Sequence, residues 1–268
     1  MRLRYLALFT AVLGLLSCTK QNPGDLATAQ RIATDAPSPA ALALPPSPGY
    51  TPPALASESN KILVDASRDG GVWWYPQHPG TGFDAGAPHQ GKALADYLRS
   101  LGFVVDELPR GAEITGELLG QYDKVIRANA FNQYTPSELT AYNAFLDRPS
   151  ALLLLQDHHK NTTNDNLSER LGLPFSGAQS GTITRFAPHD ITRGVTSLYY
   201  VAGSVIPNPD PKKITVLGTL TASADSTASA AMGIVHHPSS RVFFLGDTNG
   251  LEQVPQPLTS NIVKWLFQ

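Results

Sequence analysis

Polar side chains that can take part in acid–base chemistry follow several apolar segments of this 268-residue sequence. Asp157 and His158 come directly after a run of four leucines, and Asp65 and Asn129 each follow a shorter apolar run. An aspartate beside a histidine can accept and donate protons. Carboxylate, imidazole and amide groups together can also hold zinc or another divalent ion. The sequence lacks the His-x-x-x-His and His-Glu-x-x-His spacings that would support a zinc site, so neither a metal nor a cofactor is predicted.

Other residues are candidates for the same site because of where they fall along the chain. Asp247 and Asn249 follow the apolar segment 242–246. Asp157, His158 and Asp247 are the catalytic candidates, and the alternative is that Asp65 and Asp157 cap helices and bond loop amides. The candidate ligand-binding residues are Asp65, Arg68, Trp73, Trp74, His89, Asn129, Asp157, His158, Asp247 and Asn249.

The leucine run that precedes Asp157 identifies the element at the centre of the fold. Leu152–Leu155 does not alternate apolar with polar residues, so neither face of the segment is predicted to contact water. This pattern favours a strand buried on both faces, as in a parallel sheet covered by helices. A buried helix is disfavoured, because Pro149 precedes the run and polar residues follow it at once.

Strand-like and helix-like segments alternate through the first two thirds of the folded region. This alternation predicts an α/β fold with a doubly wound, mostly parallel sheet, helices on both faces and a β-rich C-terminal half. Strands are predicted at 62–65, 103–105, 124–128, 151–155, 182–186, 214–220, 232–237 and 242–246. Helices are predicted to begin at Pro88, after a capping box at Thr135–Glu138, near 165, and at about 257.

Parallel strands place their carboxyl ends at one edge of a sheet, where open α/β sheets bind ligands. We expect Asp65, Asn129 and Asp157 to gather at that edge, with His89 nearby at the start of a helix. Asp247 joins them if 242–246 runs parallel to the other strands. Only four residues separate 232–237 from 242–246, which indicates an antiparallel hairpin. The histidines at 236 and 237 then belong to the opposite edge.

A long loop, residues 67–87, follows the first predicted strand and contains the adjacent tryptophans Trp73 and Trp74. Loops of this length without structure of their own are uncommon in compact domains and are often functional. The two tryptophans either stack on a sugar ring or seal the edge of the core, and the sequence favours neither alternative.

The N-terminal region has the features of a bacterial lipoprotein. Residues 1–17 contain Arg2, Arg4 and a short apolar segment, as in a secretory signal peptide. Leu15–Cys18 resembles the lipobox, so Cys18, the only cysteine, is predicted to be lipidated and held in the outer membrane. Residues 18–60 are rich in Pro and Ala and are predicted to be a disordered tether. The folded domain, 61–268, then contains no thiol nucleophile.

Five segments that occur in order resemble the class I glutamine-amidotransferase-like superfamily, near its DUF4350, trehalose-utilisation (ThuA-like) and GIFT branches. These segments are 62–65, 122–126, 151–158, 189–195 and 241–247. The resemblance implies a flavodoxin-like sandwich. It does not imply glutaminase activity, because Asp157 stands where true members carry a cysteine after the central strand. His237-Pro238-Ser239 likewise lacks the glutamate of the family's His-Pro-Glu motif.

The combined expectation is a lipid-anchored, periplasmic, non-catalytic ligand-binding or scaffold module. The resemblance to GIFT domains suggests a saccharide ligand. The alternative is a hydrolase or lyase that acts on a periplasmic saccharide through Asp157, His158 and Asp247, and a third possibility is a subunit that binds another envelope protein. The net charge is -2, and no basic excess indicates nucleic-acid binding.

Overall fold

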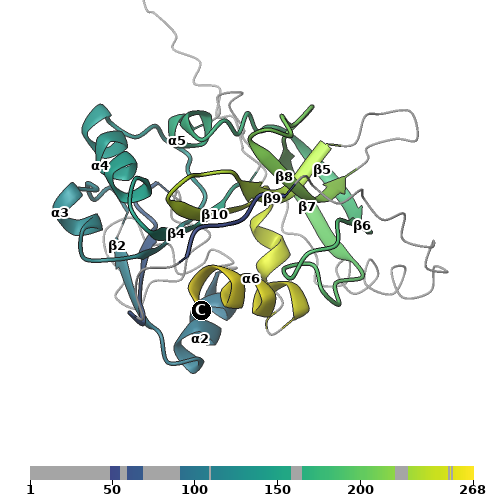
Figure 1. Cartoon of the computed structure of the whole chain (residues 1–268), viewed down its shortest axis with the longest axis horizontal. Helices are drawn as coiled ribbons and strands as arrows, with labels where there is room; N and C mark the ends of the chain where they lie inside the picture. Colours follow the sequence, from purple (N-terminus) through teal and green to yellow (C-terminus); the bar gives the residue numbers. More distant parts are fainter. Residues whose placement is uncertain are drawn as a thin grey trace, which may run out of the picture. The chain divides into compact units, whose positions relative to one another are not determined.

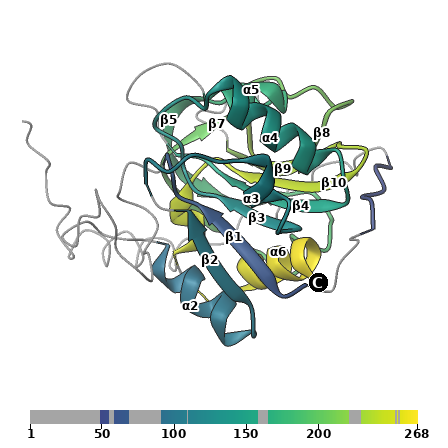
Figure 2. The same ribbon diagram turned by 90° about the vertical axis from the view of Figure 1, so that its left-hand side faces the viewer.

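The computed structural model describes most of the chain from residue 49 onward. The described residues are 49–54, 59–68, 91–108, 110–157, 165–220, 229–252, 254 and 256–268. They form three layers, in which an eight-stranded sheet lies between helices α2 and α6 on one face and α3, α4 and α5 on the other (Figures 1 and 2). No helix in these ranges is long and apolar enough to cross a membrane.

The elements follow the predicted order of alternating strands and helices. The strands are β1 (Lys61–Asp65), β2 (Val104–Leu108), β3 (Lys124–Arg127), β4 (Ser150–Leu155), β5 (Ser176–Ile183), β6 (Arg185–Phe186), β7 (Leu198–Val205), β8 (Ile214–Leu220), β9 (Ser229–Val235) and β10 (Ser240–Leu245). The helices are α2 (Lys92–Ser100), α3 (Gly116–Leu119), α4 (Pro136–Leu146), α5 (Asn166–Arg170), α6 (Pro257–Phe267) and the 3-10 helix η1 (Thr248–Leu251).

The sheet has the strand order β2-β1-β3-β4-β10-β9-β8-β6, and β5 pairs separately with β7. The first five strands are parallel, whereas β9, β8 and β6 join through antiparallel pairs. This arrangement confirms the predicted fold class. The strand predicted at 242–246 runs parallel to β4, which meets the condition set for Asp247, and its predicted hairpin with β9 is confirmed. The predicted strand 182–186 is divided between β5 and β6, and β7, α3 and η1 were not predicted.

All six residues of β4 are buried. Leu153 and Leu155 pack in the cluster beneath α2 and α6, while Leu152 and Leu154 pack in the cluster beneath α4 and α5. Because both faces of the strand are covered by helices, apolar residues occur at consecutive positions rather than alternate ones. Burial of both faces of β4 therefore explains the leucine run, as the sequence pattern predicts.

The predicted capping box is present in the structure, and a glycine follows the end of another helix. Thr135 and Glu138 form a capping box at the start of α4, where the Thr135 side chain accepts the Glu138 N–H and Pro136 stands at the first helical position. After α2, Gly102 has a φ of 87°, the left-handed conformation that favours glycine at this place. Pro88, the predicted first residue of α2, lies outside the described residues.

Residues 49–54 lie within the predicted tether and nevertheless contact the domain. The Tyr50 ring stacks on His236 at a centroid distance of 4.5 Å, and the Tyr50 hydroxyl donates to the His237 carbonyl at 3.0 Å. The Arg241 Nε donates to the Pro53 carbonyl at 2.9 Å. The prediction of a disordered tether did not include these contacts. They attach the segment at the amino ends of the parallel strands.

Candidate functional site

The carboxyl ends of the parallel strands bring four of the predicted site residues to one edge of the sheet. Asp65 ends β1, Asn129 follows β3, Asp157 follows β4 and Asp247 follows β10. The chain passes from β1 outward to β2 and then returns to β3 on the other side of β1. This reversal creates a switch point, the place at which ligands bind to open α/β sheets. The predicted residues Cys18, Trp73, Trp74, His89 and His158 lie outside the described residues.

Asp65 is 1% exposed, and its two carboxylate oxygens accept hydrogen bonds from within the protein. Oδ1 accepts the Ser67 backbone N–H at 3.0 Å, and Oδ2 accepts the hydroxyls of Tyr134 at 2.8 Å and Tyr142 at 2.5 Å. Burial, followed by the charge of Asp65, raises the pKa of both tyrosines well above their ordinary value. Both hydroxyls therefore remain donors at neutral pH, and Asp65 holds α4 against the end of β1.

Arg68 also contacts the start of α4. Its Nη2 lies 2.7 Å from each carboxylate oxygen of Glu138. Glu138 additionally accepts the backbone N–H groups of Thr135 at 2.8 Å and Ile114 at 3.1 Å. Burial alone would raise the pKa of Glu138, but these amide donors and the Arg68 charge hold the pKa below its ordinary value. Arg68 therefore joins the loop after β1 to α4 through a charge-assisted pair.

A fully buried arginine, Arg127, lies at the end of β3 and is 0% exposed. Its Nη2 donates to Gln156 Oε1 at 2.9 Å and to Ser168 Oγ at 3.3 Å, and lies 3.4 Å from Asp165 Oδ2. Asp165 in turn caps α5 by accepting the Ser168 N–H at 2.9 Å. Within the described ranges, the Nε and Nη1 of Arg127 and the Oδ1 of Asn129 are buried without a hydrogen-bond partner.

The carboxylates of Asp157 and Asp247 lie where β4 and β10 end side by side. Asp247 is 0% exposed. Its Oδ1 accepts the Asn249 backbone N–H at 2.9 Å, and its Oδ2 accepts the Val201 backbone N–H. Asp157 is partly exposed and accepts the Thr248 hydroxyl. Asp247 therefore acts as the cap of η1 and binds β7, while Asp157 holds the same short helix from the neighbouring strand.

Strand β7 crosses close to the end of β10 at Gly246. The Ser204 backbone N–H donates to the Gly246 carbonyl at 2.7 Å, and the Tyr200 hydroxyl donates to the Ser204 carbonyl. A Cβ at position 246 would overlap the Ser204 carbonyl oxygen and the Tyr200 hydroxyl. Glycine at this position is therefore required for the close approach of the two strands.

The pKa of Asp247 is raised from 3.8 to about 8. Burial is the largest cause, and the charges of Asp157 and Glu252 add to it, while the amide hydrogen bonds from Val201 and Asn249 act in the opposite direction. Two neighbouring carboxyl groups in such different environments can in principle serve as an acid and a base. The two hydrogen-bonded oxygens of Asp247 and its complete burial instead fit a structural cap.

Sequence reasoning missed Arg127, Tyr134, Tyr142 and Gln156, which make the densest polar contacts at this edge. Arg127 carried one signal, since it is a charge that directly follows the apolar residues Val125 and Ile126 in a predicted strand. His236 and His237 follow β9 at the opposite edge, as the predicted hairpin requires. Among the described residues, no group of three or more His, Cys, Asp or Glu side chains is arranged to hold a metal ion.

Comparison with solved structures gives several similar folds at low sequence identity, among them the following two. The mmIFT52 N-terminal domain has a TM-score of 0.53 and 16% identity, covering 76% of this chain and 94% of that one. A protein described as ThuA-like from Bacteroides uniformis ATCC 8492 has a TM-score of 0.52 and 17% identity, covering 81% of this chain and 95% of its own. No protein-family profile and no curated protein matches the sequence. The chain therefore shares the α/β fold of these two proteins, and the likeness extends to the fold alone.

Proposed function

We propose that this protein is a lipid-anchored periplasmic module that binds a ligand at the carboxyl edge of its sheet without transforming it, and that the ligand is a saccharide. One observation supports a non-catalytic role: the buried carboxylates accept hydrogen bonds from the protein itself. Both oxygens of Asp65 and both oxygens of Asp247 accept hydrogen bonds from within the protein. The only cysteine, Cys18, precedes the folded domain, so the domain has no thiol nucleophile.

The saccharide part of the proposal depends on residues that follow β1 in the sequence. Arg68 ends the described segment after β1, and Trp73 and Trp74 come five and six residues later in the sequence. Adjacent aromatic rings present flat apolar faces of the kind that pack against sugar rings. The resemblance to GIFT domains supports a glycan by analogy of fold, which is weaker support than a site would give.

Calorimetry with the full chain and a panel of cell-wall and trehalose-type sugars tests the ligand. We expect at least one saccharide to bind, and the Trp73→Ala, Trp74→Ala double variant to lose that binding while its thermal unfolding temperature is kept. The matched control is Trp265→Ala, which removes a tryptophan of α6 from the opposite end of the chain. The absence of binding across the panel would remove the saccharide from the proposal.

The anchor is tested separately from the ligand. The lipobox-like segment before Cys18 supports lipidation and outer-membrane retention, since several acyl chains bind a bilayer much more firmly than one. Wild-type protein is expected to incorporate labelled palmitate and to sediment with outer membranes. The Cys18→Ser variant should do neither, and labelling of that variant would contradict the anchor.

A hydrolase or lyase is the second candidate, and the environment of Asp247 favours it. Asp247, whose pKa is raised to about 8, keeps its proton at neutral pH and lies beside the partly exposed carboxyl of Asp157, and two carboxyl groups in different environments can serve as an acid and a base. Saccharide cleavage that is abolished by His158→Ala in a correctly folded protein would favour this candidate. The third candidate, an envelope-assembly subunit, predicts a protein that co-purifies from solubilised membranes.

A further inference from the structure

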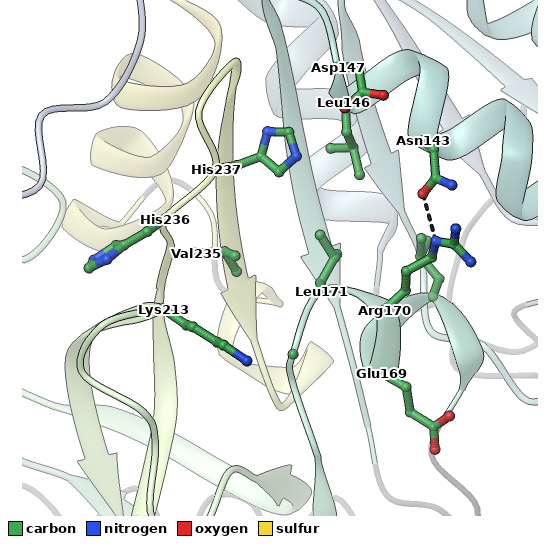
Figure 3. A pocket seen from close by; sticks show the side chains of 12 residues that line it. Asn143, Leu146, Asp147, Glu169, Arg170, Leu171, Lys213, Val235, His236 and His237 are labelled. Carbon is green, nitrogen blue, oxygen red and sulfur yellow. Dashed lines mark hydrogen bonds between the residues drawn. The ribbon is translucent and has the colours of Figure 1, made fainter.

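The amino edge of the sheet, opposite the edge described above, has an open groove of about 580 Å³. One wall is formed by the carboxyl ends of α4 and α5, and the other by the edge of β8 and β9 (Figure 3). The volume is within the range of small-molecule sites, which is roughly 300–1,000 Å³. None of the site residues predicted from the sequence belongs to this groove.

The strand wall presents nitrogen donors. In Figure 3, Lys213 and His237 extend from the strands toward Leu171 and Leu146 on the helices. His237 Nδ1 accepts the Ser239 backbone N–H at 3.4 Å, which leaves Nε2 as the protonated nitrogen of the neutral ring. Burial lowers the pKa of His237, and the charge of Asp147 partly offsets this effect. The Nζ of Lys213 makes no ion pair or hydrogen bond within the described ranges.

The helix wall carries mainly acidic side chains. Asp147 is the C-cap of α4, and Glu169 lies in the last turn of α5. Both side chains are exposed, and neither carboxylate has an ion-pair partner among the described residues. The carboxyl ends of helices add partial negative charge. Arg170 is the one cation on this wall, and its Nε donates to Asn143 Oδ1 at 2.8 Å (Figure 3).

The floor between the two walls is apolar. Leu146, Leu167 and Val235 are buried residues that line the groove, and Leu171 is partly buried beside them. The groove thus combines a positive wall, a negative wall and an apolar floor. A ligand that matches all three must carry both charges and an apolar group.

We propose that this groove binds a short zwitterionic peptide with an apolar side chain. Its amine faces Asp147 and the helix ends, its carboxylate faces Lys213 and the Nε2–H of His237, and its side chain packs on Leu146 and Leu171. A ligand with only a negative charge would leave Asp147 and Glu169 without a partner, and a ligand with only a positive charge would leave Lys213 without one. This site is independent of the saccharide proposed for the carboxyl edge.

Calorimetry with the full chain and three probes tests the proposal: the dipeptide Leu-Leu, its N-acetyl form and its C-terminal amide. Leu-Leu should bind, and each blocked form should bind roughly 1.5- to fivefold more weakly, the range of one solvent-exposed ion pair. Lys213→Ala should weaken Leu-Leu and N-acetyl-Leu-Leu but leave the affinity for the amide unchanged. Asp147→Asn should weaken Leu-Leu and the amide and leave the N-acetyl form unchanged.

Lys264→Ala is the matched control, since Lys264 is an exposed lysine on α6 that does not line the groove. It should bind all three probes as the wild type does. Equal affinity for the three probes, or no binding of Leu-Leu, would overturn the proposal. N-acetyl-Leu-Leu that binds as tightly as Leu-Leu would also overturn it, because that result indicates a site for anions alone.

Discussion

The two edges of the sheet use their polar side chains in opposite ways. At the carboxyl edge, Asp65 and Asp247 are buried, and their oxygens accept hydrogen bonds from tyrosine hydroxyls and backbone amides. At the amino edge, Asp147 and Lys213 are exposed, and both line a groove. The carboxyl edge is the expected place for a ligand in this class of fold. The comparison shows that topology gathers polar groups at one edge, whereas the segments packed against that edge decide whether those groups are available.

This difference has a direct consequence for mutagenesis. Buried polar groups that satisfy one another are costly to remove, because each lost acceptor leaves a donor without a partner. Exposed charges contribute little to stability and are available to a ligand. Substitutions of the buried carboxylates at the carboxyl edge should therefore change folding, and substitutions of the exposed groove charges at the amino edge should change binding.

Asp65→Ala is expected to have the largest effect. The substitution leaves two buried tyrosine hydroxyls and the Ser67 N–H without their acceptor, which should lower the free energy of unfolding by about 3–5 kcal/mol. Urea denaturation measures this change. Tyr134→Phe removes one donor and leaves no donor unpaired, so it should cost only about 1 kcal/mol. Similar costs for the two variants would contradict the arrangement around Asp65.

The second prediction concerns the pH dependence of stability and Asp247. The unfolded carboxyl ionises near its ordinary pKa of 3.8, whereas the folded carboxyl keeps its proton until about pH 8. The folded state therefore binds more protons between these values, so the contribution of Asp247 to the free energy of unfolding falls as pH rises and levels off above pH 8. In Asp247→Asn this fall should be absent. Urea denaturation across that pH range measures it, and identical pH profiles for variant and wild type would be inconsistent with a raised pKa.

The third prediction concerns the segment that crosses the amino edge. Tyr50→Ala removes a ring stacked on His236 and a hydrogen bond to the His237 carbonyl, and should lower the free energy of unfolding by about 1–2 kcal/mol. Tyr50→Phe keeps the stack and should lose less than half of that amount. If both variants match the wild type in denaturation, the contacts of residues 49–54 contribute nothing to stability.

The smallest effect on stability is expected at the groove. Lys213→Ala and Asp147→Asn change exposed side chains that have no ion-pair partner among the described residues, so each should alter the free energy of unfolding by less than about 0.5 kcal/mol. The same denaturation series measures this change. A large loss of stability in either variant would show that these charges hold the fold, as the carboxylates of the other edge do.

The sequence predicted the fold well because burial leaves a clear pattern in a parallel sheet. Leu152–Leu155 identified β4, and the short connection before β10 identified the hairpin. Strand β7 was missed for a physical reason. Its burial does not alternate regularly, and Ala202 within it has a φ of 54°, so no strand period is visible.

The site was predicted less completely than the fold. Topology was sufficient to place Asp65, Asn129, Asp157 and Asp247 at one edge, as the structure confirms. Their hydrogen-bond partners could not be predicted, because Tyr142 and the backbone of Val201 come from segments distant in the sequence. A charge at the end of a strand is usually solvent-exposed, but Arg127 is buried and contacts Gln156 after β4 and Ser168 of α5.

The central claim is that the carboxyl edge binds a ligand and does not react with it. Chromatographic analysis of the saccharide panel after prolonged incubation with the full chain tests this claim most directly. The account predicts that every saccharide, including those that bind, is recovered unchanged. A cleavage product that forms with the wild type and is lost with Asp247→Asn, at a pH where that variant is folded, would contradict it.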